Sequence, residues 1–138
     1  MKQNILLVGI LMLITNLVYA QVTKYRVVFD MTSRDTINQQ SLIREIGLIK
    51  NANPAAKLEV VVYGQGLDLV VKDRSTQQSA VQKIIAGSQA TFKVCAMTLK
   101  RNNIGKDQLL AGVEIVPDGI YEIISKQAEN WGYIKVAH

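Results

Sequence analysis

The stretch TFKVCAMTLKRN, residues 91–102, indicates how the chain folds, because a strand pattern in it leads directly into a helix pattern. Thr91 to Cys95 is a short, mainly apolar run with β-branched and aromatic residues, which is typical of a strand. Residues 96–102 can continue as a helical turn. A strand that passes at once into a helix is typical of α/β proteins, in which the two kinds of element alternate.

Four further runs share this strand pattern and lie on both sides of residues 91–95. They are rich in Val and Ile and cover residues 25–29, 58–63, 113–116 and 133–136. Most are apolar almost throughout and do not alternate with polar residues. This pattern is expected of strands that are covered on both faces.

Three segments between these runs carry apolar residues at helical spacing, namely residues 36–52, 76–86 and 118–131. Strands that alternate with helices imply a parallel sheet with helices on both of its faces. The sequence therefore predicts a three-layer α/β/α sandwich on a mainly parallel five-stranded sheet.

The ends and faces of these helices contain recognisable local signals. Thr36 and Gln39 have the spacing of a capping box, and Ser75 is suited to cap the second helix. Glu122 and Lys126 are four residues apart on the third helix, where opposite charges attract.

The N-terminus has the three-part layout of a secretory signal peptide. Lys2 gives a short basic start, residues 5–17 are almost wholly apolar, and Val18-Tyr19-Ala20 supplies small residues at the cleavage positions. A membrane-spanning helix needs roughly 20 apolar residues, so the shorter run favours a cleaved signal over a permanent anchor or a core helix. We expect residues 1–20 to be removed, which leaves no stable membrane span and a periplasmic or secreted protein.

The remaining residues, 21–138, have the length of one domain with one core. Without Lys2, 15 basic residues face 11 acidic ones, a net charge of +4. The charges are scattered, so a solvated surface is a simpler interpretation than a nucleic-acid site. Export also argues against a nucleic-acid partner.

Several kinds of chemistry are excluded by the residues that the sequence lacks. His138 is the only His and the last residue, so neither a Ser-His-Asp nor a Cys-His arrangement is credible. A single Cys and a single His cannot build a zinc site, and no Cys-x-x-Cys is present. We expect no metal and no organic cofactor.

Two motifs at predicted strand ends are weaker candidates for binding. Gly64-Gln65-Gly66 follows a strand but lacks the third glycine of a dinucleotide-binding fingerprint, because Leu69 occupies that position. A tight turn is the simpler expectation for it. Asp30 follows the first strand and could line a pocket or terminate a turn.

Cys95 is the only cysteine, and its position makes it the principal candidate for chemistry. Ligand sites in α/β sheets gather beyond the carboxyl ends of the strands, and the start of a helix favours an anion. Thr98 could donate a hydrogen bond to the thiol, and Lys100 and Arg101 add positive charge. We therefore expect a partly accessible thiol with a lowered pKa; the alternative is a buried cysteine that acts as a small hydrophobic residue.

Several stretches of the chain resemble the DsrE/DsrF-like family of small α/β proteins associated with sulfur transfer. The residues that carry the resemblance are the strand-final Cys95 and its spacing to Ile104 and Leu109, the stretch GVEIVPDG at 112–119, residues 127–134 around Trp131, and Val62-Tyr63-Gly64 followed by Gly66-Leu67. The resemblance covers roughly residues 24–136.

The resemblance implies that Cys95 carries sulfur as a persulfide, which it receives from a sulfur donor and passes to an acceptor thiol. It also implies a homo-oligomer, a trimer or a hexamer. Thr98, Gly64, Gly66 and Asp30 are the candidate binding residues around the thiol. The alternative function is that of a non-catalytic, oligomeric binding module of the periplasm in which Cys95 is buried and structural.

We predict that the exported protein begins at Gln21, because the Val18-x-Ala20 pattern follows the apolar run. The intact mass of protein recovered from the periplasm measures this directly. A mass that still includes residues 1–20 would contradict the prediction.

Overall fold

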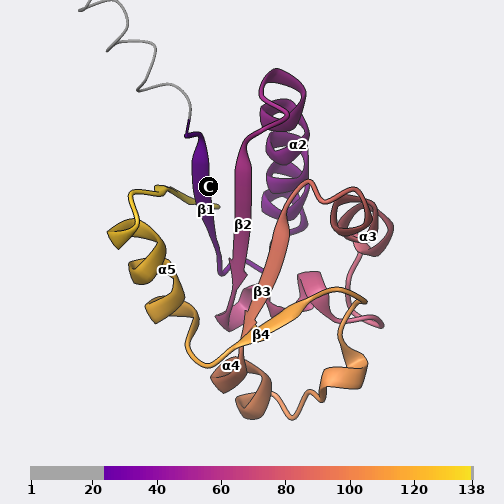
Figure 1. The fold of residues 1–138 in the computed structure, drawn as a ribbon. Helices are drawn as coiled ribbons and strands as arrows, with labels where there is room; N and C mark the ends of the chain where they lie inside the picture. The colour runs from indigo at the N-terminus through magenta and orange to yellow at the C-terminus, as the bar shows by residue number, and fades with distance from the viewer. Residues whose placement is uncertain (1–23, 138) are drawn as a thin grey trace, which may run out of the picture.

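The computed structural model describes residues 24–137, which form a sheet covered by helices on both faces (Figure 1). The sheet contains five strands in the order β4-β3-β2-β1-β5, and every pairing between them is parallel. The predicted three-layer α/β/α sandwich is therefore confirmed. The predicted signal peptide, residues 1–20, lies outside the described residues.

The strands alternate with helices along the chain, as the sequence predicted. The strands are β1 (Arg26–Met31), β2 (Lys57–Val62), β3 (Thr91–Cys95), β4 (Glu114–Val116) and β5 (Gly132–Lys135). The helices are α2 (Thr36–Ala52), α3 (Gln78–Ala86), α4 (Ala96–Arg101) and α5 (Gly119–Ala128), with short 3-10 helices η1 (Gly64–Val70) and η2 (Lys106–Gln108). Within residues 24–137, no helix combines the length and the apolar composition that a membrane crossing requires.

The two faces of the sheet are covered unequally. Figure 1 shows α2 and α3 on one side, α5 on the other, and α4 at the edge where β3 ends. The main apolar core lies on the α2 and α3 side. It includes the fully buried side chains Phe29, Met31, Leu42, Ile46, Leu69, Phe92 and Leu110.

The core beneath α5 is much smaller. Val28 and Val61 from the sheet pack there against Ile123 of α5, and Tyr63 lies beside them. The remaining side chains of this face are largely polar or charged. One helix and a small apolar cluster therefore cover the face on which Cys95 lies.

Two predicted caps are wrong. Asp35 begins α2, because its Oδ1 accepts a hydrogen bond from the Ile37 N–H at 2.8 Å. A carboxylate one residue earlier thus does what Thr36 was expected to do. The cap residue of α3 is Gln77, and Ser75 instead accepts a hydrogen bond from the Gln77 N–H at 3.2 Å in the preceding turn.

Gly64-Gln65-Gly66 does not form a simple tight turn, because the chain continues from it as the 3-10 helix η1. Gly64 has a positive φ of 58°, which glycine adopts without strain. A Cβ on Gly66 would collide with the carbonyl oxygen of Met31. Gly66 is therefore required for η1 to pack against the end of β1.

We predict that Gly66→Ala destabilises the fold by about 1–3 kcal/mol, since the backbone of Met31 has to move to admit the methyl group. Gly47→Ala is the matched control, because a Cβ at Gly47 in α2 meets no atom within 4 Å. That variant should be more stable than the wild type by about 0.5–1 kcal/mol. Urea unfolding measures both changes, and equal stability of the two variants would contradict this packing.

Candidate thiol site at the end of β3

Cys95 is the last residue of β3 and the cap residue of α4. Its side chain lies on the α5 face of the sheet. Only 6% of the residue is exposed, so the thiol is less accessible than the sequence led us to expect. The same burial is what the alternative interpretation, a structural cysteine, requires.

The hydrogen-bond donors around the sulfur determine its acidity. Burial alone would raise the pKa of the Cys95 thiol, because it removes water from the charged form. The backbone N–H groups of Gly119, Thr98 and Met97 and the hydroxyl of Thr98 oppose this effect, and together they lower the pKa below its ordinary value. The surroundings of Cys95 therefore favour the thiolate, although water hardly reaches it.

These donors come from the starts of two different helices. Met97 and Thr98 belong to the first turn of α4, whereas Gly119 is the first residue of α5. Asp118 caps α5 by accepting hydrogen bonds from the N–H groups of Ile120 at 2.8 Å and Tyr121 at 3.2 Å. The N–H of Gly119 is not used by that cap and remains available to Cys95.

Gly119 also brings α5 close to the sheet. A Cβ on this residue would lie 3.2 Å from the Cβ of Cys95, 3.3 Å from Cγ1 of Val61 and 3.4 Å from Cδ1 of Tyr63. These distances are tight for carbon atoms, so a larger residue would push the helix start away from the thiol. Nothing in the sequence alone marked Gly119 as a neighbour of Cys95; the available signal was Pro117-Asp118-Gly119, a helix start that directly follows a strand.

Thr98 connects the thiol to the turn after β2. Its Oγ1 accepts a hydrogen bond from the Gly64 N–H at 3.2 Å, and its hydroxyl is among the groups that lower the pKa of Cys95. Since an acceptor bond to Gly64 uses a lone pair, the Thr98 proton is free to point toward the sulfur. Two of the predicted binding residues, Thr98 and Gly64, thus act together, while Gly66 packs against β1.

Asp30 lies on the same face of the sheet but contacts other partners. It is 4% exposed, and its Oδ2 accepts hydrogen bonds from the Tyr133 hydroxyl at 2.6 Å and from Nζ of Lys135 at 3.2 Å. Burial and the nearby Asp30 charge raise the pKa of Tyr63 to about 12, so this tyrosine keeps its proton. Tyr63 follows β2, the strand that lies between β1 with Asp30 and β3 with Cys95.

Lys100 and Arg101 are exposed, so solvent screens their charges from Cys95. Arg101 lies on a cavity of about 180 Å³ that borders Thr98 and also carries Arg34 and Asn102. Cys95 does not line this cavity, so Thr98 separates the two.

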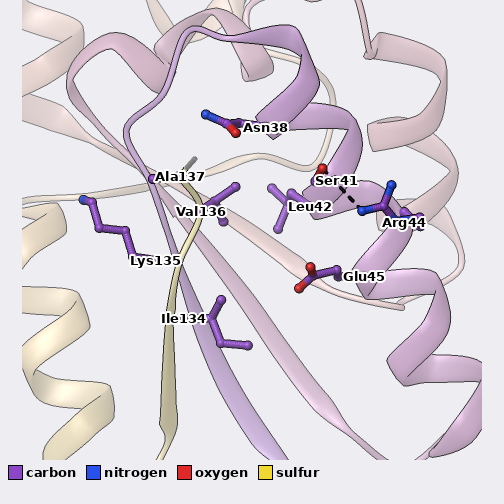
Figure 2. A pocket seen from close by; sticks show the side chains of 9 residues that line it. All are labelled: Asn38, Ser41, Leu42, Arg44, Glu45, Ile134, Lys135, Val136 and Ala137. Atoms are coloured by element: carbon purple, nitrogen blue, oxygen red, sulfur yellow. Dashed lines mark hydrogen bonds between the residues drawn. The ribbon is translucent and has the colours of Figure 1, made fainter.

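A second cavity, of about 110 Å³, lies between α2 and β5 (Figure 2). Ile134 and Val136 point into it from β5 and the residue that follows, whereas Lys135 points away, toward the opposite face of the sheet. Two of its polar residues are joined within α2, where Nη2 of Arg44 donates a hydrogen bond to Oγ of Ser41 at 3.5 Å. This cavity is thus remote from the thiol. Within residues 24–137 no three His, Cys, Asp or Glu side chains are grouped as a metal site requires.

Comparison with known proteins assigns the fold to a family. The sequence profile described as the DsrE/DsrF-like family matches residues 24–136. No curated protein sequence matches the chain.

Three solved structures are similar over most of their length. A protein of unknown function from Methanobacterium thermoautotrophicum is 30% identical, with a TM-score of 0.77, and the match covers 81% of this chain and 99% of that one. The YchN protein from E. coli is 12% identical, with a TM-score of 0.64 and coverages of 83% and 99%. A conserved protein of unknown function from Bacteroides thetaiotaomicron is 13% identical, with a TM-score of 0.66 and coverages of 80% and 94%.

We predict that Thr98→Val raises the pKa of Cys95 by up to about one unit, because one hydrogen bond to the thiolate is lost. The Gly64 N–H also loses its acceptor, which should cost about 1–3 kcal/mol of stability. Thr98→Ser keeps the hydroxyl and serves as the control, with both quantities close to wild type. The pH dependence of alkylation of the single thiol measures the first effect, and an unchanged midpoint in Thr98→Val would show that the hydroxyl does not reach the sulfur.

Proposed function

We propose that this chain, which belongs to the DsrE/DsrF-like family, carries sulfane sulfur on Cys95 as a persulfide. Membership in this family suggests a role related to sulfur relay. The observation that supports persulfide chemistry is the placement of Cys95 between two helix starts, whose N–H groups lower the pKa of its thiol.

The transfer needs a nucleophile and, later, a leaving group, and the same sulfur atom serves as both. The Cys95 thiolate attacks the outer sulfur of a donor R–S–SH; a new S–S bond forms, the donor S–S bond breaks, and R–S⁻ leaves. In the second step an acceptor thiolate attacks the outer sulfur of the Cys95 persulfide, and Cys95 leaves as a thiolate. Both steps exchange one S–S bond for another, so they require no external oxidant or reductant.

The N–H groups of Gly119, Thr98 and Met97 contribute to both steps, because each step has a negative charge on Sγ of Cys95. The cavity beside Thr98 supports an anionic donor, since Arg34 and Arg101 both border it. A small polysulfide carries negative charge and is the simplest probe of this class.

The burial of Cys95 favours a second candidate function, that of a non-catalytic binding module in which the cysteine is structural. With 6% of the residue exposed, a donor reaches the sulfur only if the first turn of α4 or α5 moves. This candidate requires neither sulfur loading nor a reactive thiolate. Substitution of Cys95 distinguishes the two functions.

We predict that Cys95→Ser abolishes persulfide loading and preserves stability. Serine cannot hold sulfane sulfur, and no second cysteine exists to replace Cys95. A serine at the first position before α4 is also a good helix cap. After incubation with polysulfide, the wild type should gain about 32 Da, the mass of one sulfur atom in a persulfide, and the Ser variant should gain nothing.

Cys95→Ala is the matched control for stability. It also lacks the thiol but cannot cap α4, so it should be less stable than Cys95→Ser by about 1 kcal/mol. If Cys95 is only a buried hydrophobic residue, the order reverses, because alanine leaves no buried hydroxyl without a partner. A wild type that gains no mass, together with a Ser variant that melts below the Ala variant, would support the structural role.

We also propose that the protein is exported and forms a trimer or a hexamer. Four large apolar side chains are exposed on α4 and α5: Met97 at 57%, Ile120 at 56%, Tyr121 at 69% and Ile124 at 56%. Such side chains are typical of a surface that is covered by another protein surface. A second copy of the chain is the occupant that this proposal assigns to it.

We predict that Ile120→Lys combined with Ile124→Lys dissociates the oligomer, because the charges disrupt an apolar interface. Leu48→Lys is the control, since Leu48 is 61% exposed on α2, on the other side of the sheet. Light scattering at micromolar concentration measures the mass of each protein. A monomeric wild type would refute the proposal, and dissociation by Leu48→Lys would place the interface elsewhere.

A further inference from the structure

Four charged side chains lie between the sheet and α5, and the thiol chemistry does not use them directly. Glu59 of β2 and Lys93 of β3 face Glu122 and Lys126 of α5; we call these four residues the charged quartet. Nζ of Lys93 lies 2.7 Å from Glu122 and 3.1 Å from Glu59, and Nζ of Lys126 lies 3.7 Å and 3.6 Å from the same two carboxylates. The exposed fractions of the side chains run from 4% to 19%, so solvent screens these contacts little.

The quartet and the thiol are neighbours along the interface between β3 and α5. Lys93 precedes Cys95 by two residues, so both side chains lie on the same face of the strand. Glu122 follows Gly119 by three residues, which is about one helical turn. Lys93 contacts Glu122 of α5, and two residues further along β3 Cys95 lies beside Gly119, the first residue of the helix.

The apolar contacts of α5 are too few to fix by themselves where the helix lies along the sheet. Ile123 is the only residue of the helix in the small core, beside Val28 and Val61. Apolar contacts have no preferred direction, whereas a 2.7 Å ion pair allows little sliding. Since an ion pair that is shielded from solvent adds little net stability compared with apolar residues, we attribute to this pair a role in positioning rather than in stability.

We propose that Lys93 and Glu122 are positioning residues for Cys95: their partly buried ion pair holds the first turn of α5 against the end of β3, where the backbone of Gly119 lies beside the thiol. The proposal rests on the proposed function in that it treats the thiolate as the working form of Cys95. Glu59 and Lys126 support the pair from either side. The far end of α5 is held separately, because Nη2 of Arg26 donates to the carbonyl oxygen of Glu129 at 2.8 Å.

A direct electrostatic effect of the quartet on the thiolate is the alternative, and it predicts the opposite sign for one variant. The other charged or titratable groups near Cys95 are Tyr63 directly after β2, Asp30 beyond it on β1, Asp118 at the start of α5, and the exposed Lys100 and Arg101 of α4; all of them remain unchanged in the test. Loss of the Glu122 charge would by itself favour the thiolate and lower the pKa of Cys95. If instead the first turn of α5 moves away from Cys95, the thiolate loses a hydrogen bond and the pKa of Cys95 rises.

The test is the pH midpoint for alkylation of the single thiol by iodoacetamide in Glu122→Met, Lys93→Met and the wild type. Methionine is similar in length to both side chains but cannot form an ion pair. We expect both variants to move the midpoint upward by about one pH unit, because a hydrogen bond to a charged group carries roughly the free energy of one such unit. The double variant should shift no further than either single variant, since one contact is lost in all three.

Two controls separate position from charge and from general stability. Glu122→Gln removes the charge but keeps an oxygen that accepts from Lys93, so its midpoint should stay close to wild type. Lys50→Met removes an ammonium group that donates to the carbonyl oxygen of Ala56 at 2.9 Å on the opposite side of the sheet. It should lower stability and leave the midpoint unchanged.

A downward shift in Glu122→Met, or an upward shift of equal size in Lys50→Met, would overturn the proposal. If circular dichroism shows that Glu122→Met does not fold, Glu122→Gln decides between the two explanations. A downward shift of its alkylation midpoint would show that the Glu122 charge acts directly on the thiolate. The measurement needs no sulfur donor. Failure of persulfide loading would therefore leave this result intact, and failure of the positioning test would leave persulfide loading to be judged by its own mass shift.

Discussion

The parallel pairing of the five strands is the constraint on which the rest of the structure depends. Parallel strands all end at the same edge of the sheet, and each needs a crossover to return the chain to its start. Helices that follow the strands therefore begin at that edge. The starts of α4 and α5 meet at Cys95 for this reason, because β3 and β4 are neighbours and each leads into a helix.

Two opposing effects act on the thiol at this edge. Burial removes water and disfavours the thiolate, whereas N–H groups from two helix starts replace the lost water with fixed donors. The donors prevail in this structure, so the pKa is lowered in a nearly inaccessible place.

One face of the sheet carries most of the apolar core, and the other carries the thiol site. The side with α2 and α3 carries most of the apolar core, which is enough to hold the strands together. The α5 side carries Asp30, Tyr63 and the charged quartet, which add direction and charge to a small apolar cluster. The exposed apolar side chains of α5 lie on its outer surface, so the same helix joins the thiol site to the proposed oligomer contact.

The amino-acid sequence by itself determined the elements of this fold and the position of the thiol. Apolar runs, helical spacing and the single strand-final Cys95 are local features, and local features persist in the folded state. One error was local, because Asp35 rather than Thr36 caps α2 through the N–H of Ile37, two residues away. Another choice required neighbours in space, because η1 replaces a simple turn where Gly66 packs against Met31. The contact of Gly119 with Cys95 and that of Glu59 with Lys93 and Glu122 were decided only by the tertiary structure, since both depend on which strands lie side by side.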